Sequence, residues 1–245
     1  MKQARYGSPA GPAVDPTEFL ARAGVHYKRR GIYPYCAACG EVVDLYGVFN
    51  ANPGTTARFD HKDRPDNANP LDECVLSKRN SRLDFLIPSG FDDDRGERIR
   101  QQFRDPEFLA LAYNFCLSLC RKGNLSAAQF RDLCKRADKK RIWAYADIRV
   151  WSIPYILLVL GDFTATNSNG RQYDFRFVFR KPRGSDLSAL WLRPSSCHIE
   201  KVFDGGKPLK TDDNPYPVSE TDFQMKAGDA SWINVHLLRQ LDWAA

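Results

Sequence analysis

Apolar residues in the segment 107–121 recur at steps of three and four, which is the spacing of a helix with one buried face. Asp105 and Pro106 precede the segment, and both residue types are typical of a helix start. The same reasoning predicts helices between Asp15 and Gly24, over Arg95–Phe103, from Ser126 onward and over Ser231–Trp243.

Beyond Trp143 the pattern favours strands. Over 173–180, Phe175, Phe177 and Phe179 alternate with other residues and would share one face of a strand. The segment 167–170, Asn-Ser-Asn-Gly, predicts a hairpin turn ahead of it. Strands are also predicted over 153–160 (before the turn), 189–192 and 197–203, and earlier in the chain over 42–46 and 57–59. Helices and an antiparallel sheet in one chain predict an α+β fold.

The chain divides into three parts by composition. Residues 1–14 are rich in Gly, Pro, Ala and Ser, which predicts a flexible lead-in. Residues 15–90 are broken repeatedly by Pro and Gly and hold too few apolar residues for a core of their own. We therefore predict a small domain over 15–90 that packs on an α+β domain over 91–245, built from several helices and an antiparallel sheet.

Composition narrows the class of protein. The hydrophobic fraction is 43% and the charged fraction 27%, which excludes wholesale disorder. The longest apolar run, 153–160, is far shorter than the roughly 20 residues of a membrane span, and the first residues lack the apolar segment of a secretory signal. We expect a cytoplasmic protein with no membrane partner. In that reducing compartment, clustered cysteines favour metal over disulfides.

Cys36 and Cys39 form a Cys-x2-Cys knuckle that is followed directly by Gly40. Two thiolates at this spacing reach one ion if the backbone turns tightly, and the glycine permits that turn. His61 and Cys74 complete the pattern Cys-x2-Cys-x21-His-x12-Cys, which predicts a tetrahedral Zn²⁺ site. Zinc binding would contribute on the order of 10–16 kcal/mol, enough to hold a segment without a core.

Alternatives to this ligand set stay open. His26 would replace one of the later ligands, or the Cys36–Cys39 pair is incidental to metal binding. A redox-active dithiol is disfavoured, because that motif opens a helix whereas Val42 and Val43 continue as a strand. The remaining cysteines are predicted to be core residues: Cys116, Cys120, Cys134 and Cys197.

The knuckle within 35–40, the strand Arg58-Phe59-Asp60-His61 and the final Cys74 resemble the N-terminal zinc ribbon of the competence CoiA-like proteins. In that family the ribbon precedes a nuclease-like domain with carboxylates and a Lys or Gln on adjacent strands. The resemblance implies nucleic-acid processing in a DNA-uptake, mobile-element or defence system. The nuclease signature itself, Glu-x-Lys or Glu-x-Gln after an aspartate-bearing strand, is not matched.

A metal-dependent nuclease is one alternative function. It needs two or three carboxylates on neighbouring strands and a cation. The nearest match is Asp162 with Asp174 and Arg176, where arginine substitutes poorly for lysine. His198 and Glu200 form a second candidate pair on one strand face. Solvated turn residues and exposed alternation explain both patterns better than catalysis does. No nucleophile or phosphate-loop motif occurs, so no catalytic residue is assigned.

Charge is the remaining signal. The net charge is +6, and eight basic residues against two acidic ones fall between 121 and 141. On the helix predicted after Ser126, basic residues spaced four apart would neutralise phosphates, and a second basic group precedes the knuckle. We predict binding of nucleic acid, DNA or RNA, through Lys28, Arg29, Arg30, Arg131, Lys135, Lys139 and Lys140.

The competing hypothesis is a protein-interaction or structural component. Zinc ribbons are common in protein contacts, and a basic stripe is also typical of a solvated helix face. A protein partner therefore stays open beside nucleic acid.

Overall fold

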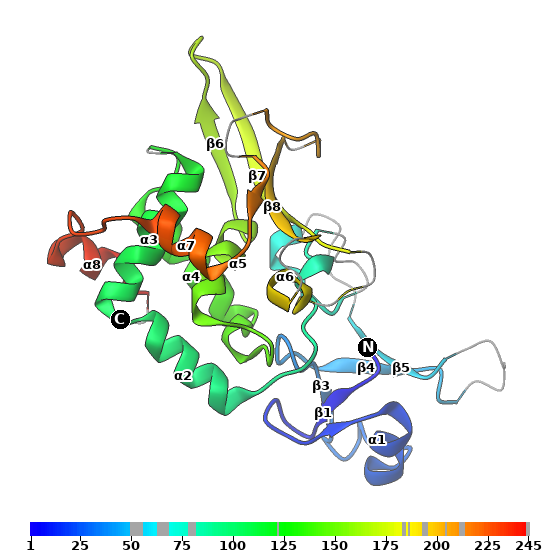
Figure 1. Ribbon diagram of the computed structural model, residues 1–245. Coiled ribbons are helices and arrows are strands. Elements are labelled where there is room, and N and C mark those ends of the chain that lie inside the picture. The colour runs from blue at the N-terminus through cyan, green and yellow to red at the C-terminus, as the bar shows by residue number, and fades with distance from the viewer. Residues whose placement is uncertain are drawn as a thin grey trace. The chain divides into compact units, whose positions relative to one another are not determined.

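The computed structural model describes residues 1–49, 56–62, 69–77, 82–121, 123–182, 185, 187–192, 196–203, 205–210 and 214–243. The chain forms two compact units, Met1–Asp84 and Phe85–Ala245. Helices and antiparallel sheets make up an α+β fold, which confirms the predicted class (Figure 1).

Short antiparallel strands around one helix build the first unit. One sheet has the order β2-β1-β3, and a second pairs β4 with β5 so that Val43 lies opposite His61. The elements are β1 (Ala4–Tyr6), β2 (Ala13–Val14), α1 (Pro16–Ala23), β3 (Pro34–Tyr35), β4 (Val43–Tyr46), β5 (Arg58–His61) and the 3-10 helix η1 (Pro70–Asp72), with η2 (Asp84–Leu86) at the boundary.

Residues 1–14 differ from the flexible lead-in that composition predicts. Ala4 pairs with Val14 and Arg5 with Tyr35, so this segment supplies two strands of the first sheet. Ala4 and Val14 are buried. The Gly and Pro residues between them form the turn that joins two strands, with Gly7 at φ +70°, a conformation that favours glycine. Composition alone does not separate such a turn from a loose terminus.

The helix α1 begins as predicted and anchors a small aromatic core. The Asp15 carboxylate accepts a hydrogen bond from the Glu18 backbone N–H at 2.8 Å. Phe19, which is fully buried, makes edge-to-face contacts with Tyr27 at 5.3 Å and Phe59 at 6.0 Å between ring centroids. Because Phe59 lies in β5, this cluster fixes the strand that carries His61.

The second unit combines helices with one antiparallel sheet of order β6-β7-β8-β9. Figure 1 shows β6 and β7 as a long hairpin that extends past the helices of this unit. The elements are α2 (Asp93–Phe103), α3 (Pro106–Cys120), α4 (Ala127–Lys139), η3 (Ile142–Ala144), η4 (Val150–Ser152), α5 (Ile153–Val159), β6 (Asp162–Thr166), β7 (Gln172–Arg180), α6 (Ala189–Leu192), β8 (His198–Phe203), β9 (Tyr216–Pro217), α7 (Glu220–Ala227) and α8 (Val235–Leu241).

Two strand predictions in this unit are wrong. Within the segment 153–160, residues 153–159 form the helix α5. All of its residues are buried, so it shows no alternation between apolar and polar positions. It packs against α3 and β7, and the strand that enters the hairpin is β6. The segment 189–192 is the short helix α6 instead of a strand. Among the described residues, no helix is both long and apolar enough to cross a membrane.

Gly96 allows α2 to approach η3 closely. A Cβ atom at this position would lie 2.7 Å from the Cα of Ala144. We expect Gly96→Ala to lower the free energy of unfolding by about 1–3 kcal/mol, because overpacking outweighs the gain in helix propensity. Urea denaturation measures the change.

The matched control is Gly205→Ala, because a Cβ at Gly205 meets nothing within 4 Å. Its expected shift is within about 0.5 kcal/mol. Equal destabilisation by the two substitutions would show that close approach at Gly96 does not limit the packing of α2.

Candidate metal centre

A tight turn after β3 positions the first two predicted ligands. The Gly40 N–H donates to the Cys36 carbonyl at 2.9 Å, and the Cys36 N–H donates to the Glu41 carbonyl at 2.8 Å. Gly40 has φ +70°, as the predicted knuckle requires. This backbone conformation brings Cys36 and Cys39 toward a common point.

The other two predicted ligands come from separate elements of the same unit. His61 is the last residue of β5, and Cys74 follows η1. The side chain of Asn69 caps η1 by accepting from the Leu71 N–H at 2.9 Å, which fixes the path of the chain just before Cys74. The structure therefore brings all four predicted ligands together.

The spacing of the four ligand atoms matches one tetrahedral ion. All lie within 4.8 Å of one another, with Cys36 Sγ 3.6 Å from Cys74 Sγ and Cys39 Sγ 3.4 Å from His61 Nε2. Bonds of about 2.3 Å to sulfur and 2.0–2.1 Å to nitrogen place ligands of a tetrahedral zinc about 3.8 Å (S to S) and about 3.6 Å (S to N) apart. The distance from Cys36 Sγ to Cys74 Sγ also far exceeds the length of a disulfide bond. The group can hold a metal ion.

Backbone amides also point at the sulfurs. The Ala38 N–H donates to Cys36 Sγ at 3.3 Å, and the Leu76 N–H donates to Cys74 Sγ at 3.4 Å. Hydrogen bonds from the Cys39 and Cys74 thiols lower the pKa of Cys36 to about 3. The pKa of Cys74 is raised, because its thiol donates to Cys36 and Cys39 and is buried. A thiolate held at Cys36 at neutral pH favours a cation at this point.

Burial of the centre is uneven. Cys36 and Cys74 are buried, whereas Cys39 and His61 are partly exposed. His61 directs Nε2 at the cluster, and its Nδ1 is buried with no hydrogen-bond partner among the described residues. The ring therefore has one nitrogen committed to the ligand group, and its orientation depends on the surrounding packing instead of a second hydrogen bond.

The alternative ligand is not part of the group. His26 is exposed and does not belong to the cluster that the described residues form.

Burial raises the pKa of the Cys116 and Cys134 thiols. The four cysteines outside the cluster are buried, as expected of core residues: Cys116, Cys120, Cys134 and Cys197.

The first group of predicted nucleic-acid contacts lies in the first unit, in the turns after α1. Lys28, Arg29 and Arg30 are all exposed. Lys28 Nζ pairs with Asp44 at 3.1 Å, and Arg30 donates to the Ala23 carbonyl at 2.8 Å. Two of these three cations are therefore engaged within their own unit.

The second group lies on or beside α4 in the second unit. Lys135 and Lys139 are exposed, Arg131 is partly exposed, and Lys135 is 3.9 Å from Asp132. Lys140 is 4% exposed, so its prediction as a surface contact is wrong. The helix ends at Lys139, and the chain then turns so that the following lysine faces the interior.

Each candidate catalytic carboxylate lies opposite a basic or hydroxyl side chain or accepts a hydrogen bond from one. Asp162 lies opposite Arg176, while Asp174 lies opposite Thr164 and accepts its hydroxyl hydrogen bond at 2.7 Å. Glu200 accepts a hydrogen bond from Arg180 at 2.7 Å. Among the described residues, the cysteine–histidine cluster is the one group of three or more His, Cys, Asp or Glu side chains close enough to hold a metal.

Comparison with known proteins gives no relative: no family model, curated protein or solved structure matches the chain. The residues themselves therefore carry the functional argument. Sequence reasoning missed one pocket in the second unit, because Arg98 is distant in the chain from Arg149 and Trp151 and the three residues share no motif.

Proposed function

We propose that the chain is a zinc-binding protein that binds nucleic acid, DNA or RNA, through the exposed basic residues of α4. The observation that supports its zinc-binding part is the Cys36, Cys39, His61 and Cys74 cluster. Its nucleic-acid part is supported by the exposed lysines on α4 and the net charge of +6.

The ligand chemistry favours zinc over harder cations. Three thiolates and one imidazole suit Zn²⁺, whereas Mg²⁺ and Ca²⁺ take oxygen ligands. Four protein ligands fill a tetrahedral shell and leave no position for water or substrate. The proposed role of the zinc is therefore structural.

The basic side chains of α4 would bind the phosphate backbone and would not recognise a particular base sequence. Arg131, Lys135 and Lys139 are spaced four residues apart, so they follow one side of the helix. Each phosphate neutralised by such a group releases condensed counterions, which makes binding strongly dependent on salt. The resemblance of residues 35–74 to the CoiA-like ribbon supports the same proposal and extends it to DNA uptake, mobile elements or defence.

A salt titration tests the proposal. We expect affinity for a DNA or RNA oligonucleotide to fall steeply with salt, and Lys135→Glu with Lys139→Glu to reduce the slope of log K against log salt by about 2. Fluorescence anisotropy of a labelled oligonucleotide measures both quantities.

The matched control reverses two charges elsewhere in the same unit, at the exposed residues Lys207 and Lys210. It should leave the slope near the wild-type value. Absence of binding at low salt would instead favour a protein-interaction component. An equal effect of the control pair would place the contact surface away from α4.

A further inference from the structure

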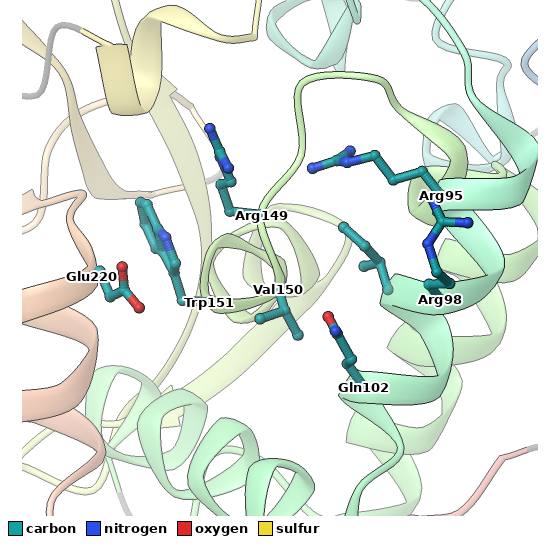
Figure 2. Close-up of a pocket in the computed structure, with 8 residues that line it drawn as sticks. Arg95, Arg98, Gln102, Arg149, Val150, Trp151 and Glu220 are labelled. Carbon is teal, nitrogen blue, oxygen red and sulfur yellow. The ribbon is translucent and has the colours of Figure 1, made fainter.

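A pocket of about 480 Å³ lies within the second unit (Figure 2). Its walls come from α2, from the segment around η4 and from the start of α7. The lining residues are Arg95, Arg98, Ile99, Gln102, Arg149, Val150, Trp151 and Glu220. This volume lies within the usual range of small-molecule sites.

Positive charge dominates the pocket. The lining holds three arginines and a single carboxylate residue, Glu220. Arg98 and Arg149 are exposed and have no ion-pair partner among the described residues. Guanidinium groups without a carboxylate partner retain their full capacity to hold phosphate in a bidentate manner.

The third arginine is held rigidly by backbone groups. Arg95 donates to the carbonyls of Tyr145 at 3.2 Å and Ala146 at 3.0 Å, and also to that of Ile148. These bonds fix the guanidinium without cancelling its charge, so it adds a preorganised positive potential to the pocket.

An indole, two polar groups and two aliphatic side chains complete the lining. Trp151 is partly exposed, and edge-to-face contacts with Tyr155 and Trp191, both at 6.2 Å between centroids, hold its ring. In Figure 2 Glu220 lies at the left beside Trp151, Arg95 and Arg98 lie at the right with Gln102 below them, and Arg149 lies between the two groups. The pocket therefore combines cationic groups, an aromatic side chain with a carboxylate beside it, and an amide.

We infer that this pocket binds a nucleotide. Arg98 and Arg149 hold the phosphate, Trp151 stacks on the base, and Glu220 accepts a hydrogen bond from an exocyclic amino group. A purely polyanionic ligand fits less well, because the Glu220 carboxylate would repel it. The nucleotide is either free or the phosphorylated end of a single strand. The inference does not depend on the zinc centre or on the lysines of α4.

Isothermal titration of the full chain with AMP tests the inference. We expect AMP to bind at least about tenfold more tightly than inorganic phosphate or adenosine, because each of these makes only one part of the contacts. Arg98→Ala and Arg149→Ala should each weaken AMP binding by about 10- to 100-fold. Both side chains are exposed, so circular dichroism should show an unchanged fold.

Arg171→Ala is the matched control, since Arg171 is exposed on the hairpin turn and does not line the pocket. It should bind AMP as wild type does, and so should the variant with Lys135→Glu and Lys139→Glu. Competition by a 5′-phosphorylated oligonucleotide would identify a strand end as the source, and its absence a free nucleotide. Phosphate binding as tight as AMP binding, no AMP binding, or AMP binding unaffected by both arginine substitutions would overturn the inference.

Discussion

Cys36→Ser should remove zinc from the protein and unfold residues 1–84 while residues 85–245 stay folded. The serine hydroxyl is a poor zinc ligand, and the three remaining ligands cannot satisfy the ion alone. Metal binding of this kind contributes on the order of 10–16 kcal/mol, whereas the aromatic core around Phe19 is small. Elemental analysis of protein purified without added metal should fall from about one zinc per chain to near zero.

Limited proteolysis measures the structural part of this prediction. The variant should be cut throughout the first unit and yield a resistant fragment from the second. Cys120→Ser is the matched control, because Cys120 is buried in α3 outside the cluster and its loss should leave zinc content unchanged. A wild-type protein without zinc, or a variant that retains it, would contradict the assignment of the centre.

Asp138→Ala should lower the free energy of unfolding by about 2–4 kcal/mol. Its carboxylate accepts two hydrogen bonds from Arg100, both at 3.0 Å, and the indole N–H bonds of Trp143 at 2.6 Å and Trp243 at 2.9 Å. The substitution leaves a partly buried cation and two indole donors without this partner. Removing only one member of an ion pair is costly, because the other member stays in place without its partner. The bond to Asp138 also raises the pKa of Arg100.

Chemical denaturation measures the effect of Asp138→Ala. Asp132→Ala is the matched control, because Asp132 is an exposed carboxylate on the same helix whose nearest pairing, with Lys135, is 3.9 Å. Its expected change is within about 0.5 kcal/mol. Similar changes for the two variants would show that the carboxylate does not join α4 to α2 and the C-terminal residues.

The candidate metal ligands could be predicted because their chemistry is local. The knuckle requires two cysteines, a short spacing and a glycine, and all of these are visible in a few residues. Gly40 has the positive φ that this motif requires. The contribution of His61 and Cys74 followed from ligand count, since a tetrahedral ion needs four donors.

Helices with capped, amphipathic sequences were also predictable, as α3 and α4 illustrate. The helix α5 was not, because complete burial removes the polar positions that would reveal a period. The helix α7 was missed although Ser219 accepts a hydrogen bond from the Asp222 N–H at its start, so a cap search would have found it.

Local sequence patterns do not predict whether a single side chain is buried, and they do not predict a pocket that distant segments build together. Lys140 looks like its exposed neighbours in the sequence, and only the turn after α4 places it in the interior. Arg98 and Trp151 come together through the packing of α2 beside η4, which no local pattern encodes.

The boundary between the two units, which falls between residues 84 and 85, has an evolutionary consequence. Every residue of the candidate metal centre precedes this point, and every residue that lines the arginine pocket follows it. Each site is thus encoded by one continuous segment of the gene. Recombination at that junction would transfer the whole cysteine–histidine cluster or the whole pocket to another protein without splitting either one.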